Sequence, residues 1–344
     1  MRTLLTVAAG LLVVAMPAAA NDTMSQLGTG GLIFLTTEDV SMDSEDLTVG
    51  PEQVKVVYSF TNHSKQDQHT LVAFPLPDIT GDGDFMVNVP TEDPDNLFGF
   101  TTTFDGNPVS STLHQYAFAV GIDQTELLKS LNVPLAPFGS ATTEALNALS
   151  KDDQAKLLHL GMVIPMTYDS GNGEQTDYTP IWTLKSTYSW EADFKAGETA
   201  KVVHTYKPSV GGTVATIFLQ PPYDASDEDR PKLYKDKYCT DSNFIKTVKA
   251  SLKDPKDLYS APYTESWISY IWSTGGNWSG PIGKFHLTID KGDPKNLVSF
   301  CWDGDVKKTG PTTFEMQATD WYPPYNRELE ILILDHQEPE GEAG

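Results

Sequence analysis

Aromatic side chains that could stack on a ligand gather between positions 267 and 302, where the chain reads W-I-S-Y-I-W-S-T-G-G-N-W and later S-F-C-W. Tryptophan and tyrosine bury large apolar bodies but keep a polar edge that needs a partner. Such a cluster is therefore either the hub of a β-sheet core or a flat face that binds a sugar ring or a protein. The candidate ligand-binding residues are Trp267, Tyr270, Trp272, Trp278 and Trp321.

The spacing of two of these tryptophans predicts how they would be placed. Trp267 and Trp272 are separated by an odd number of positions. Side chains in a strand alternate between the two faces, so these two rings are expected on opposite faces of a sheet. One of them could then be exposed while the other is buried.

A run of acidic residues offers a different chemistry. The segment P-D-I-T-G-D-G-D contains Asp78, Asp82 and Asp84, whose carboxylates are the hard oxygen ligands that Ca²⁺ prefers. The spacing is not that of an EF-hand loop, and turn-forming Asp and Gly explain the run without any ion. A calcium site is therefore one hypothesis beside an ordinary turn, and no other cofactor is expected.

Signatures of catalysis are absent from the sequence. It contains no G-x-S-x-G, H-E-x-x-H, G-x-x-x-x-G-K-[ST] or C-x-x-C motif. The tripeptide Lys308-Thr309-Gly310 matches penicillin-binding enzymes, but no S-x-x-K supplies their nucleophile. We therefore name no catalytic residue and favour a protein that is not an enzyme. A secreted hydrolase that uses a pair of carboxylates remains the enzymatic alternative.

Two cysteines, Cys239 and Cys301, are the only ones in the chain. An even number of cysteines in an exported protein is expected to pair, and this pair lacks the spacing of a metal-binding or redox motif. The disulfide would close a loop of about 60 residues and stabilise the fold by up to about 4 kcal/mol.

The first twenty residues predict export. They combine Arg2, an apolar run and the small residues Ala18-Ala19-Ala20, an order typical of a secretory signal peptide over residues 1–20. Cleavage near Ala20 would leave a chain that begins at Asn21. No later stretch approaches the roughly 18 apolar residues that a membrane-spanning helix needs. We expect a soluble protein of the periplasm or the extracellular space.

The balance of charge restricts the partners. The chain holds 24 basic and 47 acidic residues, a net charge of −23, and loss of the predicted signal peptide changes this to 23 − 47 = −24. Such a charge repels nucleic acids and anionic membrane surfaces. The expected partner is a periplasmic protein or a glycan, and the sequence leaves the oligomeric state open.

Alternating β-branched and aromatic residues predict a strand over 54–60, and further strand-like segments lie over 70–77, 200–208 and 214–219. Between them, Asp123 to Glu126 has capping-box spacing, and Ser150 begins a second helical pattern that ends at Gly161. The predicted fold is therefore mainly β, with one or two antiparallel β-sandwiches and a small helical insertion at about 123–161.

The composition of residues 221–231 is that of a linker, P-P-Y-D-A-S-D-E-D-R-P. It predicts an N-terminal β-sandwich over 21–222 and a C-terminal, Trp-rich β region over 223–335 with the disulfide. In the second part Phe244, Ile245 and Val248 predict one helix. Residues 336–344 are expected to form a disordered tail.

Several motifs together resemble a known family. They are S-M-D-S-E-D-L at 41–47, F-P-L-P at 74–77, H-T-Y-K-P-S-V-G-G at 204–212 and G-N-W-S-G-P-I-G-K-F at 276–285. They resemble a family of exported bacterial proteins known as domain of unknown function four-four-two-four, over essentially the whole chain after residue 20. The resemblance implies a Gram-negative periplasm and no activity.

A looser likeness is to β-sandwich domains of the vault and inter-α-trypsin-inhibitor type. It depends on the pattern G-F-x-x-x-x-D-G-x-x-V at 99–109 and G-E-x-x-x-V-x-x-x-Y at 197–206. A likeness at the level of the fold implies no function.

These observations lead to one preferred hypothesis and two alternatives. We favour a non-catalytic periplasmic β-sandwich protein that binds a partner protein or a glycan through an aromatic face in its C-terminal half. The alternatives are a secreted hydrolase with a carboxylate pair and a Ca²⁺-stabilised structural protein.

Overall fold

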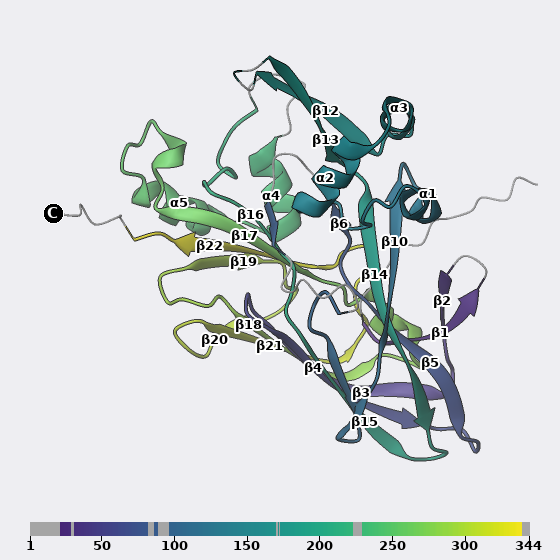
Figure 1. Ribbon diagram of the computed structural model, residues 1–344. Helices are drawn as coiled ribbons and strands as arrows, with labels where there is room; N and C mark the ends of the chain where they lie inside the picture. Colours follow the sequence, from purple (N-terminus) through teal and green to yellow (C-terminus); the bar gives the residue numbers. More distant parts are fainter. Residues whose placement is uncertain are drawn as a thin grey trace, which may run out of the picture.

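The computed structural model of the chain describes residues 21–28, 31–81, 86–88, 96–169, 171, 173–222 and 229–338 (Figure 1). The predicted signal peptide lies outside this part. Strands hold 46% of the chain and helices 17%, and the sheets are largely antiparallel, which confirms the mainly β fold class.

An eight-stranded sheet forms one layer of the core and runs in the order β20-β21-β18-β3-β4-β15-β8-β9. Its strands are β3 (Val40–Val49), β4 (Val54–Asn62), β8 (Thr101–Phe104), β9 (Asn107–Val109), β15 (Thr199–Tyr206), β18 (Ile282–Asp290), β20 (Lys307–Lys308) and β21 (Thr313–Trp321). β18 pairs with β3 in parallel. Strands from both sides of residue 222 therefore share this sheet, while the domain boundary predicted there stays a prediction.

Two further sheets pack on the same core. A seven-stranded sheet runs β11-β10-β14-β5-β1-β2 with β6 beside β14, and a five-stranded sheet runs β19-β22-β17-β16-β7. The strands of the first are β1 (Thr23–Gly28), β2 (Gly31–Leu35), β5 (Gln68–Pro75), β6 (Ile79–Thr80), β10 (Thr112–Ala119), β11 (Ile122–Asp123) and β14 (Thr183–Phe194). Those of the second are β7 (Met86–Asn88), β16 (Val210–Thr213), β17 (Tyr263–Tyr270), β19 (Leu297–Phe300) and β22 (Leu329–His336).

Alternation along β4 shows how the sequence builds the core. Every second residue from Val54 to Phe60 is buried, and the residues between them are partly or fully exposed. The buried face joins one continuous cluster with Phe74 of the seven-stranded sheet and Tyr270 of the five-stranded sheet. The three sheets therefore form a β-sandwich around one core, as the period-two pattern predicts.

The helical insertion is confirmed and has a small core of its own around Trp182. It contains α1 (Thr125–Ser130), α2 (Ser140–Ala148) and α3 (Lys151–His159), followed by the two-stranded ribbon of β12 (Val163–Asp169) and β13 (Glu174–Pro180). Ser150 caps α3 by accepting from the Asp153 N–H. The capping box predicted at Asp123 is not formed, because Asp123 lies outside the helix and accepts from the Thr125 N–H instead.

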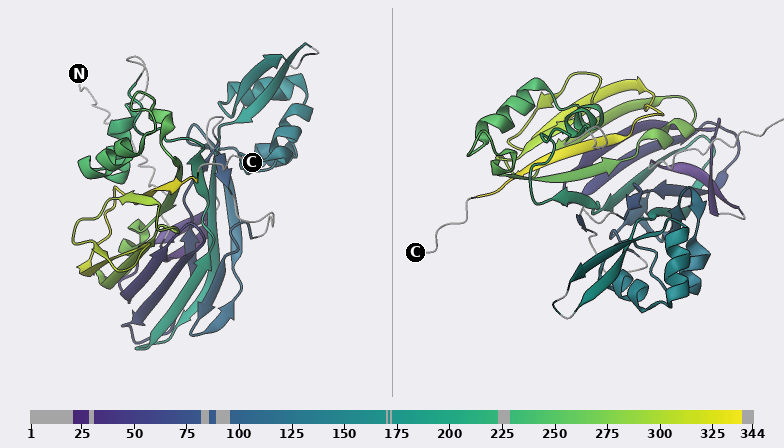
Figure 2. Two further views of the ribbon diagram at one scale, coloured as in Figure 1. Left: turned by 90° about the vertical axis from the view of Figure 1, so that its left-hand side faces the viewer. Right: turned by 90° about the horizontal axis from the view of Figure 1, so that it is seen from above.

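Two α-helices, not one, follow residue 222 in the part of the chain that the structure describes, together with two short 3-10 helices over Leu258–Ser260 and Ser273–Asn277. The α-helices are α4 (Arg230–Tyr238) and α5 (Ser242–Ser251), which pack with the five-stranded sheet in a third apolar cluster. In Figure 2 these helices and the helical insertion form two separate lobes at the same end of the molecule. Helices of the described ranges are all too short to serve as membrane spans.

The prediction of a strand over 214–219 is wrong. The backbone N–H groups of this segment do not join a sheet ladder, because those of Ile217 and Phe218 both donate to the carboxylate of Glu265, at 2.5 and 2.9 Å. A side chain has replaced the neighbouring strand as hydrogen-bond partner, and the segment forms a loop.

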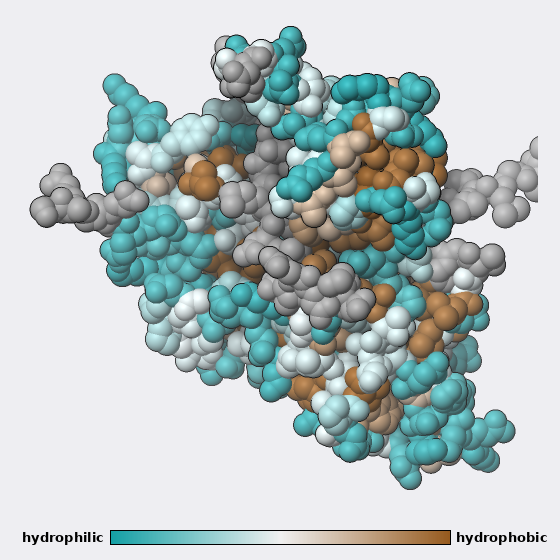
Figure 3. Space-filling model, viewed as in Figure 1, coloured by the Kyte–Doolittle hydropathy of each residue, from teal (hydrophilic) through white to brown (hydrophobic). Residues whose placement is uncertain are grey.

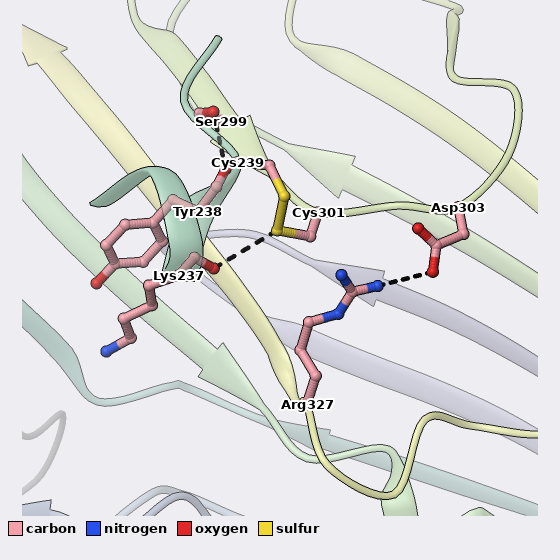
Figure 4. Close-up of a disulfide and its surroundings, with 7 residues drawn as sticks. All are labelled: Lys237, Tyr238, Cys239, Ser299, Cys301, Asp303 and Arg327. Atoms are coloured by element: carbon pink, nitrogen blue, oxygen red, sulfur yellow. Dashed lines mark hydrogen bonds and ion pairs between the residues drawn. A yellow bond between two sulfur atoms is a disulfide. The ribbon is translucent and has the colours of Figure 1, made fainter. Parts of the chain in front are cut away.

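The disulfide between Cys239 and Cys301 is confirmed (Figure 4). It joins the residue that follows α4 to the residue that follows β19. Beside it, the Ser299 hydroxyl donates to the Tyr238 carbonyl oxygen at 2.9 Å. The C-terminal end of α4 is thus fixed to the five-stranded sheet by one covalent bond and one hydrogen bond.

At the other end of the chain, the sheet extends into the segment predicted as a tail. His336 is the last residue of β22, and the Gln337 N–H donates to the Pro262 carbonyl oxygen at 2.8 Å. Residues 339–344 lie outside the described part.

Candidate functional site

Three of the five predicted aromatic residues lie in the core. Tyr270, Trp272 and Trp278 are almost fully buried. The Trp272 indole N–H donates to the Arg327 carbonyl oxygen at 2.7 Å, and the Trp278 indole N–H donates to the Asp22 carbonyl oxygen at 2.5 Å. The polar edges of these rings therefore have protein partners, and no ligand can stack on the rings while the core is closed.

A fourth, Trp321, is half-buried against the same core. Its ring stacks on Phe285 with centroids 4.2 Å apart and meets the edge of Trp272 at 5.2 Å. The structure thus brings Trp321 and Trp272 together as core packing. Ligand binding by these residues stays a prediction.

Trp267 stands apart from the other four. It lies on the opposite face of β17 from Ile268 and Tyr270, and it packs with the cluster under α4 and α5. Trp272 packs in the core cluster, but it lies after the end of β17, so the alternation that predicts opposite faces for Trp267 and Trp272 does not reach it. Trp267 is the predicted ligand-binding residue that the structure places at the edge of a hollow.

The hollow lies between α4 and the outer face of the five-stranded sheet and has a volume of about 250 Å³. Its lining is mostly aromatic and apolar with two cations: Ile217, Arg230, Leu233, Tyr234, Lys237, Tyr238 and Trp267. We call it the Trp267 pocket. Five of these seven residues come from α4 at helical spacing, so one face of that helix forms a wall of the pocket.

Local sequence explains why α4 forms there. Asp229 caps the helix by accepting from the Lys232 N–H at 3.2 Å, and Pro231 stands in the first turn, where its missing N–H costs nothing. The disulfide fixes the other end. The helix is therefore held at both ends, which fixes the positions of Arg230 and Lys237 along the pocket.

The flat face of the Trp267 ring depends on a glycine of the neighbouring strand. Gly211 of β16 pairs with Trp267, and a Cβ atom at position 211 would lie 3.0 Å from Cε3 of the indole. Only a residue without a side chain allows the ring to lie this close to β16. This gives a physical role to the V-G-G of the motif at 204–212.

Two cations stand on the α4 side of the pocket. The Arg230 guanidinium donates to the Gln220 side-chain oxygen at 2.9 Å, and within the residues that the structure describes it forms no ion pair. Lys237 Nζ lies 3.5 Å from a carboxylate oxygen of Glu330 and 5.2 Å from the centre of the Tyr238 ring. A guanidinium offers five donors, so Arg230 retains the capacity to bind an anionic group.

Glu265 lies under the pocket and is buried. Its carboxylate accepts from the Ile217 and Phe218 N–H groups and from the Tyr234 hydroxyl, the last at 2.6 Å. Burial raises the pKa of Glu265, while these hydrogen bonds lower it. The carboxylate therefore holds the loop at 216–218 and Tyr234 in place as parts of the pocket.

A second set of polar groups lies deep between the three sheets. This buried polar cluster consists of Asn21, Asp22, Glu45, Tyr58, His204 and Tyr270, each at most 1% exposed. Asp22 pairs with His204 Nε2 at 3.0 Å, and burial raises the pKa of Asp22 and that of Glu45, the latter to about 8.

The buried polar cluster bears on the hydrolase hypothesis. A pair of catalytic carboxylates with one raised pKa needs a cleft that admits a substrate and water. Asp22 and Glu45 have raised pKa values but no exposed surface. The arrangement favours a structural role for both carboxylates over catalysis.

The predicted calcium ligands are only partly described. Asp78 pairs with Lys185, whose Nζ lies 2.7 Å from Asp78 Oδ2. Asp82 and Asp84 lie outside the described residues, so the calcium site stays a prediction. Among the residues that are described, no three His, Cys, Asp or Glu side chains form a group that could hold a metal ion.

Sequence reasoning missed the cations of the pocket and the buried polar cluster. Arg230 and Lys237 lie in a segment with the composition of a linker, although Leu233, Tyr234 and Tyr238 repeat there at helical spacing. For the cluster, the signal was a polar side chain at a strand position that the alternating pattern places toward the core. His204 stands between the buried Val202 and Tyr206 in this way.

Comparison with known proteins places the chain in a family. Residues 20–332 match the family described as Domain of unknown function (DUF4424), and the chain belongs to it, which confirms the resemblance seen in its motifs. No curated protein matches the chain. The looser likeness to vault and inter-α-trypsin-inhibitor domains stays a prediction.

Among solved structures, the chain is similar to a candidate nutrient binding protein from Legionella pneumophila. The match has 11% sequence identity and a TM-score of 0.44, and it covers 92% of this chain and 70% of that one. We transfer no residue role from it.

Proposed function

We propose that this protein is a non-catalytic binding protein whose ligand is a small acidic molecule with one flat or apolar ring, held in the Trp267 pocket. The observation that carries the proposal is the combination of an indole face with Arg230 and Lys237 in one hollow. A carboxylate or phosphate of the ligand would bind the cations, and its ring would stack on Trp267.

The charge of the pocket supports an acidic ligand. The whole chain has a net charge of −23 and only three arginines, one of which lines this pocket. Among the described residues that line the pocket, the two charged ones, Arg230 and Lys237, are both cationic. Placing an arginine beside an aromatic wall in an otherwise acidic protein favours an anion over a neutral glycan or a cation.

The size of the pocket supports a small ligand. Pockets for drug-sized molecules have volumes from about 300 to 1,000 Å³. The volume here is about 250 Å³, enough for a single ring and its acidic group. An acidic sugar or an aromatic acid fits this description, whereas a long glycan would have to extend beyond the pocket.

Export belongs to the same proposal. The first twenty residues have the pattern of a signal peptide, and the disulfide is of the kind that forms in oxidising compartments. Both support a protein that acts in the periplasm, where it would meet small acidic molecules outside the cytoplasm.

Isothermal titration calorimetry with phenyl phosphate, phenol and inorganic phosphate tests the proposal. We expect phenyl phosphate to bind more tightly than either fragment, because only it fills both halves of the pocket. Trp267→Ala and Arg230→Gln should each weaken its binding about tenfold or more, since each removes one half of the contact. Lys232→Gln, on another face of α4, is the matched control and should leave the affinity unchanged. Equal binding by wild type and Trp267→Ala would contradict the proposal.

A second candidate function is docking of a partner protein on the helical insertion. Leu158 is exposed on α3, Val120 and Ile122 are exposed at the turn that joins β10 and β11, and Figure 3 shows hydrophobic residues gathered near α1 and α3. Val120 is 84% exposed and has φ of 50°, a conformation that costs free energy for a β-branched residue. An exposed apolar residue held in a strained turn favours an interaction surface.

Site-specific crosslinking tests this second candidate. A photoreactive amino acid at position 120 should crosslink one specific protein in the periplasm. The matched control is position 107, where Asn107 is exposed at the start of β9. The same crosslinks from both positions would count against docking at the helical insertion.

A further inference from the structure

The residues that would begin the chain after the predicted cleavage are buried more deeply than a chain end usually is. Asn21, Asp22 and Thr23 have no exposed surface. Terminal residues of a domain are usually exposed unless specific contacts hold them. Specific contacts must therefore hold these three residues in the core.

Asn21 is held by all of its polar groups. Its backbone nitrogen donates to Thr274 Oγ1 at 2.5 Å, its side-chain amide donates to Glu45 Oε2 at 2.9 Å, and its side-chain oxygen accepts from the Tyr58 hydroxyl. Gly275 makes room for this side chain, because a Cβ atom at position 275 would lie 2.7 Å from Asn21 Nδ2.

Asp22 continues the same attachment. Its carbonyl oxygen accepts from the indole of Trp278, and its carboxylate faces His204. The other ring nitrogen of His204, Nδ1, lies 3.1 Å from Thr102 Oγ1. Trp278, predicted from the sequence as a ligand-binding residue, thus binds the N-terminal segment of its own chain.

The groups around Asn21 carry an excess of potential negative charge. Glu45 comes from β3, Asp22 from the segment before β1, Tyr58 from β4, Tyr270 from β17 and His204 from β15. A buried carboxylate is stable in its charged form only beside a cation or several donors. His204 faces Asp22, whereas the donors to the Glu45 carboxylate are the neutral Asn21 amide and the Tyr270 hydroxyl.

We propose that cleavage after Ala20 converts the Asn21 nitrogen into an α-ammonium group that this cluster binds as its missing cation. In this step a peptidase of the exporting cell adds water across the Ala20–Asn21 peptide bond. Ala20 keeps the new carboxylate, and Asn21 keeps the amine, which takes up a proton. Thr274 Oγ1 accepts from the ammonium, and Glu45 and Asp22 supply the counter-charge. Glu45, Tyr58, Tyr270 and Thr274 then form an N-terminal site.

Cleavage would thus supply the cation that the buried polar cluster lacks. An ammonium at residue 21 adds charge complementarity that an uncleaved chain lacks, so the processed protein should be more stable than a chain with residues before Asn21. This inference rests on the predicted cleavage site and is independent of the Trp267 pocket.

Chemical labelling of the α-amine is the first test. The purified processed protein is treated with an amine-acetylating reagent at neutral pH, in buffer and in concentrated urea, and its N-terminal peptide is measured by mass spectrometry. We expect a peptide that begins at Asn21 and an α-amine that reacts at least tenfold more slowly in the folded protein than in urea. A different first residue, or equal rates, would overturn the proposal.

A double-mutant cycle tests the ionic part. The processed protein is compared with a form that retains Ala19-Ala20, each with Glu45 or Glu45→Gln, by urea denaturation. The extension should lower the denaturation midpoint more in the Glu45 background than in the Glu45→Gln background. Asp46→Asn, the exposed neighbour on β3, is the matched control and should behave like wild type. Equal effects in all backgrounds would overturn the ionic contact. Binding of phenyl phosphate, measured on the same proteins, reports on the Trp267 pocket separately.

Discussion

At the scale of single residues, Glu45 makes the stability of the fold depend on pH. Burial raises its pKa to about 8, while hydrogen bonds from Asn21 and Tyr270 oppose the shift. In the unfolded chain the carboxyl ionises near its ordinary pKa of 4.5. Between these two values the folded state holds a proton that the unfolded state has released. The free energy of unfolding must therefore fall as pH rises, by at most about 1.4 kcal/mol per pH unit.

We predict that Glu45→Gln flattens this part of the stability profile. In a chain that retains residues before Asn21, urea denaturation from about pH 4.5 to about 8 should show a falling midpoint for wild type and a weaker fall for Glu45→Gln. The fall should also be weaker in the protein that begins at Asn21, because the ammonium favours the charged carboxylate. The prediction is contradicted if the urea midpoint of wild type rises over this pH range in parallel with that of Glu45→Gln.

Gly211 makes a second prediction at this scale. In Gly211→Ala the new methyl group would meet the Trp267 ring at 3.0 Å and push it from β16 into the pocket. We expect the affinity for phenyl phosphate to fall several-fold and the indole fluorescence of Trp267 to change. Gly276→Ala is the matched control, because a Cβ atom there has nothing within 4 Å. If both variants bound like wild type, the ring would not depend on Gly211.

At the scale of elements, the pocket depends on α4 being held at both ends. The disulfide closes a chain segment with a sequence separation of 62, and its loss should lower the free energy of unfolding by up to about 4 kcal/mol. We predict that Cys239→Ser with Cys301→Ser lowers the urea midpoint and also weakens phenyl phosphate binding, because the C-terminal end of α4 carries Lys237 and Tyr238.

Reduction provides the control for this prediction. A phosphine reductant should bring the wild-type protein to the properties of the double variant and should leave the double variant unchanged. A double variant with lower stability but wild-type affinity would show that the helix keeps its position without the bond.

The elements also show what sequence patterns can predict. Apolar residues alternate along β4 and β15, and this pattern follows from one buried face. β5 is predicted from a continuous apolar run instead, and its last four residues are all buried. α4 was missed because its sequence, R-P-K-L-Y-K-D-K-Y, is mostly polar and follows an acidic, proline-containing stretch. Apolar residues do repeat at helical spacing in this segment, but the linker-like composition of the preceding residues is the stronger signal. For 214–219 the apolar composition wrongly predicts a strand. The segment is a loop, because the backbone N–H groups of Ile217 and Phe218 donate to the Glu265 carboxylate.

At the scale of the whole molecule, the candidate sites depend on contacts that no local pattern specifies. Asn21, Glu45, His204 and Tyr270 come from distant parts of the chain and meet because three sheets share one core. The sequence predicted that Trp267 and Trp272 face opposite ways. It could not say which of them is buried, because that depends on which face of the five-stranded sheet covers the core and which receives α4.

The most direct test of the proposed function is a titration followed by NMR of the indole N–H groups. The chain has seven tryptophans, so it gives seven such signals, and Trp267→Phe identifies the one from Trp267. With phenyl phosphate as the probe, we predict that the Trp267 signal shifts and saturates while those of the buried Trp272 and Trp278 stay in place. The shift should be lost in Arg230→Gln. A Trp267 signal that does not move, or that moves equally with phenol, would contradict an acidic ligand in the Trp267 pocket.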